Sequence, residues 1–193
     1  MFSKKGLISL YKSQVLSYIE YATPALHHAP HFFLQRLDQV QERFLTELGV
    51  TQILATVDFN LCPLATRRNI AMLGLIHRTV LGKGPKQFKQ FFRSGSAVAL
   101  PRMLRSPELR HDKQLYDRMN GTERNALCRY VLSLVYPYNL LPQRVVDLGT
   151  VCKFQRALQA AVKTACEQQV LDWPLVLTAG ARKLTVHRFQ SLF

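Results

Sequence analysis

The sequence predicts an all-α protein, built as an irregular bundle of about six to eight helices with room for two subdomains. Apolar residues recur at helical spacing along most of the chain, and no clear alternating strand pattern or internal repeat accompanies them. Hydrophobic residues make up 48% of the 193 residues, which is enough to bury a core. These observations favour a folded, helical protein.

The first predicted helices cover residues 7–21 and 31–48. Pro24 ends the first run, and Gly49 follows the second as a C-terminal cap. One face of the second helix carries Leu34, Leu37, Val40, Gln41, Phe44, Leu45 and Leu48. Arg36 and Arg43 lie seven residues apart and therefore share another face.

An irregular link containing Asp58 and Asn60 leads to a helix at about 63–81, where Pro63 suits the first turn. Glycines at 82 and 84 end this helix. Its apolar face holds Leu64, Ala71, Met72, Leu75, Ile76 and Val80, and its outward residues are Arg67, Arg68 and Arg78.

A short amphipathic segment follows at 85–93. Lys86, Lys89 and Arg93 fall on one side, at spacing i, i+3 and i+7. Phe88, Phe91 and Phe92 fall on the other side. A phenylalanine stripe opposite lysines is usually core, and we expect that here, although exposed phenylalanines could also stack on bases.

Residues 94–111 are rich in serine, glycine and proline and predict a linker. We therefore divide the chain into helical regions at 1–93 and 112–193. In the second region Thr122 and Thr150 are candidate caps for two helices, separated by a turn-rich stretch between Pro137 and Pro142. The tail 174–193 suggests a short helix.

The charge balance points to a polyanionic partner. The chain carries 26 Lys and Arg against 12 Asp and Glu, a net charge of +14. Residues 1–96 and 97–193 contribute +7 each, so the excess is distributed rather than confined to a tail. Nucleic acid is the commonest partner of such a surface; an anionic membrane surface or an acidic protein comes next.

Residues for catalysis, metal binding or cofactor binding are not signalled. The six aspartates stand alone in the sequence, whereas a polymerase holds two metal ions with closely placed carboxylates. No nucleotide-binding or hydrolase motif occurs. His27, His28 and His31 form the densest potential metal group, but we interpret them as ordinary loop histidines. We expect no enzyme activity, no metal and no cofactor.

The four cysteines form no C-x-x-C pair, and we expect buried, reduced thiols in an intracellular protein. No run of about 18 apolar residues predicts a membrane span, and the N-terminal segment does not have the character of a secretory signal. We therefore expect no membrane insertion.

Four blocks of sequence resemble the region that follows the palm in LINE-type (jockey-like, non-LTR) retrotransposon reverse transcriptases. They are residues 10–24 (LYKSQVLSYIEYATP), 37–44 (LDQVQERF), 62–68 with 73–75 (CPLATRR and LGL), and 138–146 with 154–158 (YNLLPQRVV and FQRAL). The blocks occur in the family's order and span about residues 7–160. Leu26 and Tyr138 stand where the family usually has tryptophan, and the catalytic palm is absent.

The resemblance implies a thumb-like region at 1–93 and a post-thumb region at 112–193. In the family the thumb packs on the primer–template duplex, so the expected partner is an RNA–DNA or DNA duplex, together with a reverse transcriptase palm in a longer protein. Nuclear localisation is implied in the same way. Without catalytic aspartates, the chain alone would not copy RNA.

The candidate phosphate-binding residues are Lys12, Arg36, Arg43, Arg67, Arg68, Lys86, Lys89 and Arg93. Any of them could instead be part of a solvated helix face. Three other interpretations stay open: a helical protein-interaction scaffold, an orphaned fragment with no independent activity, and a membrane-surface protein using residues 86–93.

Overall fold

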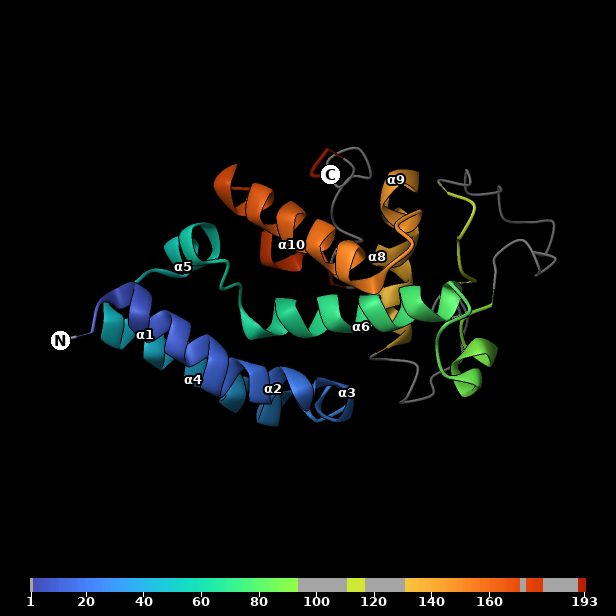
Figure 1. Cartoon of the computed structure of the whole chain (residues 1–193). Coiled ribbons are helices and arrows are strands. Elements are labelled where there is room, and N and C mark those ends of the chain that lie inside the picture. Colours follow the sequence, from blue (N-terminus) through green and yellow to red (C-terminus); the bar gives the residue numbers. More distant parts are fainter. Residues whose placement is uncertain (1, 94–110, 117–130, 171–172, 179–190) are drawn as a thin grey trace.

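The computed structural model describes residues 2–93, 111–116, 131–170, 173–178 and 191–193 (Figure 1). Within these residues the chain is all-α, as the sequence predicts, and no strand is present. The predicted linker at 94–111 and the start of the helix predicted after Thr122 lie almost wholly outside the described residues.

The N-terminal segment forms a helical hairpin. Its first arm runs through α1 (Lys4–Tyr11), a π-helical turn (Lys12–Leu16) and α2 (Ser17–Tyr21), and its second arm is α4 (His31–Leu48). A four-residue helix, α3 (Thr23–Leu26), turns the chain between the arms. The Tyr11 and Phe44 rings stack with centroids 4.3 Å apart and hold the arms together.

α4 confirms the predicted helix at 31–48, and Gly49 ends it in the left-handed conformation with φ of 60°. One residue of the predicted apolar face is misplaced. Val40 has 45% of its surface exposed, whereas Gln41 and Leu45 are buried. The reason is helical phase: Val40 lies closer in angle to Arg36 and Arg43 than to the buried stripe.

The predicted irregular link is wrong, because residues 52–59 form α5 (Gln52–Phe59). The Thr51 side chain caps this helix by accepting a hydrogen bond from the Leu54 backbone N–H. Asn60 ends it with φ of 49°, a left-handed conformation that asparagine adopts more readily than most residues. The local signal for this helix is the Thr51 cap. Because no apolar stripe follows the cap, the segment resembles a loop in the sequence.

α6 (Leu64–Val80) is the central helix (Figure 1). It lies between the hairpin and α10 (Val151–Glu167), which packs along it. The Thr150 side chain caps α10 as predicted, accepting from the Lys153 backbone N–H. Pro63 precedes α6 as its N-cap rather than entering the first turn.

The remaining described elements are short. They are the 3-10 turns η2 (Lys86–Gln90), η5 (Leu132–Leu134) and η6 (Trp173–Leu175), and the helices α8 (Val135–Leu140) and α9 (Gln143–Val146). Pro137 lies inside α8 rather than opening a turn. It is tolerated in the first turn of this helix, where backbone N–H groups have no helical acceptor.

Buried side chains form two clusters. The smaller joins the hairpin to α5 and the start of α6 through Ile8, Tyr11, Leu16, Ile19, Leu45, Val50, Ala55, Leu61 and Leu64. The larger surrounds the rest of α6 and includes Ile76, Tyr138, Phe154 and Leu158. α6 contributes to both clusters, and α5 contacts both α4 and α10, so these two helices connect the hairpin to α10.

Candidate nucleic-acid interface

Lys12, one of the eight basic residues predicted to contact phosphates, is directed towards the end of α5 instead. It is only partly exposed, and its Nζ donates a hydrogen bond to the Phe59 carbonyl oxygen at the end of α5. Burial, followed by the nearby Arg67 charge, lowers the pKa of Lys12. Lys12 therefore satisfies the backbone carbonyl of Phe59, which the end of the helix leaves without a helical donor.

Arg67 also makes internal contacts. Its Nε lies 2.5 Å from Glu20 Oε1 on α2, and its Nη1 donates to the Asn60 carbonyl oxygen at 3.3 Å. Only 13% of the arginine side chain is exposed. These contacts connect α6 to the first arm of the hairpin, and they leave little of the guanidinium available to an external phosphate.

The outward position predicted for Arg68 is wrong. Its Nη1 and Nη2 donate to the two carboxylate oxygens of Asp38 on α4, at 2.6 and 2.9 Å, and only 6% of its side chain is exposed. An arginine in the first turns of a helix is disfavoured by the helix dipole. Here the Asp38 carboxylate supplies the compensating charge, a partner 30 residues away that helical periodicity does not reveal.

Arg36 and Arg43 are exposed, as predicted, on the outer face of α4. The Arg36 guanidinium carbon lies 4.6 Å from the centroid of the Phe32 ring, a cation–π contact. Both arginines belong to the hairpin, whose buried residues form the smaller cluster. η2 packs on the larger cluster, so these arginines and the cations of η2 belong to different parts of the fold.

Lys86, Lys89 and Arg93 are all exposed around η2. The core position expected for the opposite phenylalanines is confirmed for two of them. Phe92 is buried and Phe88 packs against the larger cluster, whereas Phe91 keeps 37% of its surface exposed. The two phenylalanines anchor the turn, and the cations project from it.

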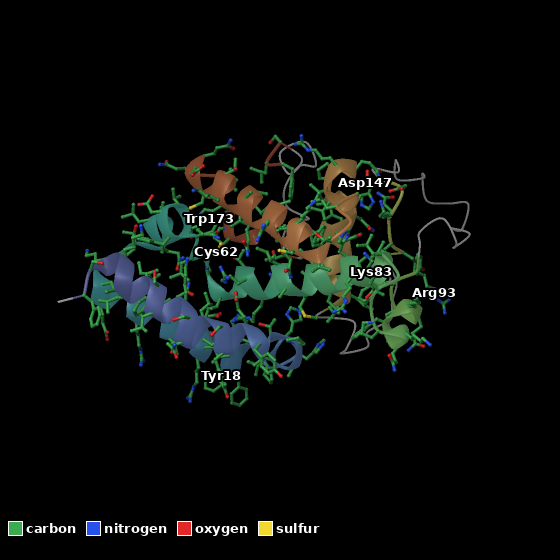
Figure 2. The ribbon with its side chains drawn as sticks, in the orientation of Figure 1. Tyr18, Cys62, Lys83, Arg93, Asp147 and Trp173 are labelled. Carbon is green, nitrogen blue, oxygen red and sulfur yellow. The ribbon has the colours of Figure 1, made fainter. Side chains whose placement is uncertain are left out.

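Two further cations lie at the same end of the molecule and were not among the predicted site residues. Arg78 is exposed near the end of α6, and its Nε donates to the Lys83 carbonyl oxygen at 3.0 Å. Lys83 is exposed and donates to the Gly149 carbonyl oxygen at 3.3 Å. Figure 2 shows Lys83 and Arg93 at this end. We call Arg78, Lys83, Lys86, Lys89 and Arg93 the basic end.

A sequence signal for the basic end exists. Between Asp58 and Glu108 the chain has no acidic residue, so the lysines and arginines of α6 and η2 have no acidic neighbour in sequence. Periodicity alone gives no reason to group Arg78 with η2. The turn at Gly82, with φ of 75°, brings the chain round after α6 and so supplies the connection.

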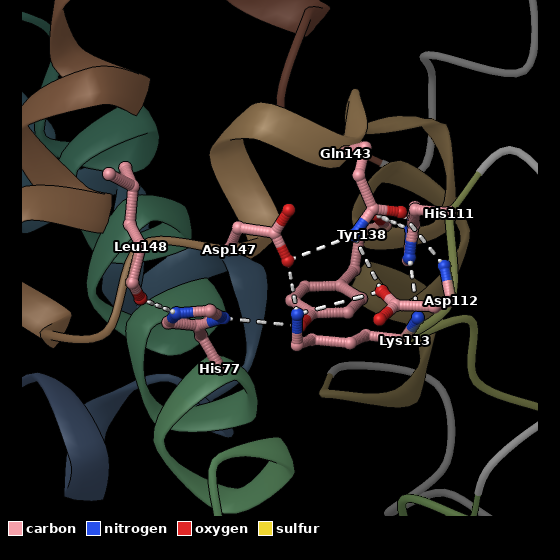
Figure 3. Close-up of polar contacts among 8 residues, drawn as sticks. All are labelled: His77, His111, Asp112, Lys113, Tyr138, Gln143, Asp147 and Leu148. Carbon is pink, nitrogen blue, oxygen red and sulfur yellow. Dashed lines mark hydrogen bonds and ion pairs between the residues drawn. The ribbon is translucent and has the colours of Figure 1, made fainter.

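A polar clasp adjoins this end (Figure 3). Lys113 Nζ lies 2.5 Å from Asp147 Oδ1 and 3.5 Å from Asp112 Oδ1. Gln143 Nε2 donates to both carboxylates, at 2.9 Å for Asp147 and 2.7 Å for Asp112. The pKa of Asp147 is lowered mainly by the hydrogen bond from Lys113. The pKa of Asp112 is lowered mainly by the hydrogen bond from Gln143.

Beneath the clasp, two histidines are held neutral around Tyr138 (Figure 3). His77 Nε2 donates to the Leu148 carbonyl oxygen at 2.7 Å, so its Nδ1 accepts from the Tyr138 hydroxyl at 3.1 Å. His111 Nε2 donates to the Tyr138 carbonyl oxygen, and its Nδ1 accepts from the Lys113 backbone N–H. Burial lowers the pKa of both histidines and raises that of Tyr138.

The described residues offer no group of three or more His, Cys, Asp or Glu side chains placed to hold a metal ion. None of the described helices has the length and apolar character of a membrane span. The prediction of buried thiols holds for Cys62 and Cys166 but is wrong for Cys152, which is exposed near the start of α10. Cys128 lies outside the described residues.

Comparison with known proteins found no match to a protein-family model, a curated protein or a solved structure.

Proposed function

We propose that the protein binds nucleic acid through the basic end, by phosphate contacts that carry little sequence information. The observation that supports this is the exposure of five cations, Arg78, Lys83, Lys86, Lys89 and Arg93, in a stretch with no acidic residue. Lysine and arginine bind phosphates as point charges or forks, and each contact releases condensed counterions from the nucleic acid.

Anchoring of the turn strengthens the proposal. Phe88 and Phe92 pack into the larger cluster, so η2 is held against the bundle rather than left as a free loop. Fixed cations lose less side-chain and backbone freedom on binding than cations on a flexible segment. The backbone N–H of Tyr116 also donates to the Arg93 carbonyl oxygen at 2.9 Å, which holds the end of the turn.

The resemblance to the thumb and post-thumb region of LINE-type reverse transcriptases favours a duplex, RNA–DNA or DNA, as the ligand. It does not favour catalysis, because the chain lacks the paired carboxylates of a polymerase palm. Of the eight candidate residues, Lys86, Lys89 and Arg93 belong to the proposed site. Lys12, Arg67 and Arg68 instead form the internal contacts described above.

The test is binding of the purified chain to a labelled RNA–DNA hybrid across a salt series, with two charge-matched variants. Lys86→Glu with Lys89→Glu reverses the basic end. Lys4→Glu with Lys5→Glu, on exposed residues of α1, lowers the net charge by the same amount at another place. We expect affinity that falls steeply with salt, a loss of at least about tenfold for the first variant, and a much smaller loss for the second.

Equal losses in both variants would mean that total charge, and not the basic end, determines binding. Absence of binding at low salt would reject the proposed function altogether. Circular dichroism of both variants checks that the helical content of the wild type is kept.

A further inference from the structure

Phe91 is a large apolar side chain that the fold leaves uncovered at the basic end. It keeps 37% of its surface exposed, and it is neither part of the larger cluster nor packed against it. Among the large hydrophobic residues exposed in the described part of the chain, Phe91 is the one that lies in the stretch without acidic residues between Asp58 and Glu108. A single exposed apolar residue is ordinary on a protein surface, so its surroundings decide whether it has a role.

Cations lie on both sides of Phe91 in the sequence. Lys89 precedes it by two residues, Arg93 follows it by two, and both side chains are exposed. Two residues of chain span at most about 7 Å, so an aromatic ring and two cations start from neighbouring points of the backbone. A nucleotide joins a flat base to a charged phosphate. Surfaces that bind single strands combine cations for the phosphates with aromatic rings for the bases.

The backbone around Phe91 is anchored. The backbone N–H groups of Phe91 and Phe92 both donate to the Phe88 carbonyl oxygen, at 3.0 and 3.2 Å. The rings of Phe88 and Phe92 stack with centroids 6.4 Å apart, and Phe92 is buried. These anchors before and after Phe91 hold its exposed ring in place, so little conformational freedom is lost when a base stacks on it.

We infer that the basic end binds nucleic acid at unpaired bases and that Phe91 is the ring on which one base stacks. The inference rests on the proposed function and narrows its ligand to a single strand, or to the single-stranded end of a duplex. Inside a duplex the faces of the bases are covered by their neighbours, and only phosphates are offered to this surface. Stacking on one aromatic side chain strengthens binding by roughly 5- to 150-fold and depends little on which base is present.

Binding of the purified, nuclease-treated chain to three labelled probes of equal length tests the inference. The probes are a single strand of DNA, the same strand with abasic positions in place of its bases, and the blunt RNA–DNA hybrid of that strand. We expect Phe91→Leu to weaken binding of the single strand by at least about fivefold, because leucine is apolar but offers no ring face. The salt slope should not change, since no phosphate contact is removed.

The controls separate stacking from other effects. Phe91→Tyr keeps the ring and should bind the single strand like the wild type. Phe33→Leu makes the same substitution on α4, where Phe33 is 58% exposed but lies away from the basic end, and it should also bind like the wild type. Phe91→Leu should bind the abasic strand and the hybrid as the wild type does, because neither probe offers an unpaired base. Circular dichroism checks that each variant keeps the helical content of the wild type.

Unchanged binding of the single strand by Phe91→Leu would overturn the inference. An equal loss on the abasic strand, or an equal loss in Phe33→Leu, would also overturn it. In each of these cases, salt-dependent binding of the hybrid would leave the proposed function in place. Absence of binding to all three probes at low salt would reject the inference and the proposed function together.

Discussion

Arg68 on α6 and Asp38 on α4 form a two-point ion pair, with N–O distances of 2.6 and 2.9 Å, that connects the hairpin to the central helix. The arginine is almost fully buried and the aspartate is one-quarter exposed. This difference in burial determines how strongly a substitution of either residue destabilises the protein. Without the aspartate a buried charge loses its partner, whereas without the arginine the aspartate can still reach water.

We therefore expect Asp38→Ala to lower the free energy of unfolding by about 3 kcal/mol, and Arg68→Met to lower it clearly less. Urea denaturation followed by circular dichroism measures both values. Affinity of the folded Arg68→Met variant for an RNA–DNA hybrid should stay close to that of the wild type, since Arg68 is not at the basic end. Equal destabilisation by the two substitutions would contradict the asymmetry.

The buried histidines predict a loss of stability in mild acid. Burial lowers the folded-state pKa of His77 and His111 below the unfolded value of about 6.5. Above that value both histidines are neutral in both states, and their effect on stability does not vary with pH. As the pH falls below it, the unfolded chain binds protons first, and stability falls by up to about 1.4 kcal/mol per pH unit for each histidine.

Urea unfolding at several pH values between about 7.5 and 5.5 measures this slope. His77→Gln keeps hydrogen-bonding groups at the site but removes one titrating group, so its slope should be shallower. Its stability at the upper pH should also be lower, because the stacking of His77 on Phe154 at 4.0 Å is lost. A slope as steep as that of the wild type would show that His77 is not responsible.

Gly84 fits tightly between α6 and η2. A Cβ atom placed there would lie 2.7 Å from the Thr79 Cα and 2.4 Å from its Oγ1, and the backbone atom cannot rotate away. We expect Gly84→Ala to destabilise the protein by about 1–3 kcal/mol. Gly149→Ala is the control, because no atom lies within 4 Å of its added Cβ, and a thermal melt should show little change.

The number of phosphate contacts at the basic end can be counted from salt dependence. If Arg93 contacts one phosphate, Arg93→Ala should reduce the slope of log affinity against log salt by about 0.9 on B-form DNA. Arg156→Ala removes an equally charged, exposed side chain from α10 and should leave the slope unchanged. Equal changes in the two variants would place the contacts elsewhere.

The thiols should differ in reactivity according to burial. Cys152 is exposed, whereas Cys62 is fully buried and burial raises the pKa of its thiol. Iodoacetamide at neutral pH should label Cys152 at least about tenfold faster than Cys62, because the reactive form is the accessible thiolate. Peptide mass spectrometry assigns each label. Rapid labelling of Cys62 would mean that the larger cluster, in which this thiol is buried, opens readily.

Local patterns predicted the long helices well. α4 begins and ends, and α10 begins, where caps and apolar spacing placed them, because Gly49 and Thr150 satisfy backbone groups within a few residues in sequence. α5 was missed because its eight residues form no clear apolar stripe, and Ala55 and Thr56 are buried only through packing on neighbouring helices. Tertiary contacts, rather than periodicity, stabilise this helix.

The sequence by itself determined the helical class, the bounds of α4 and α6, the start of α10 and the large excess of positive charge, since these depend on local spacing and composition. Tertiary structure decided which cations are available. Periodicity treats Arg68 and Arg78 alike as outward arginines of one helix, yet Asp38 on another helix buries the first, while the turn after α6 leaves the second at an exposed end. Pairing between residues far apart in sequence depends on how helices pack, and a single-helix pattern contains no information about its neighbour.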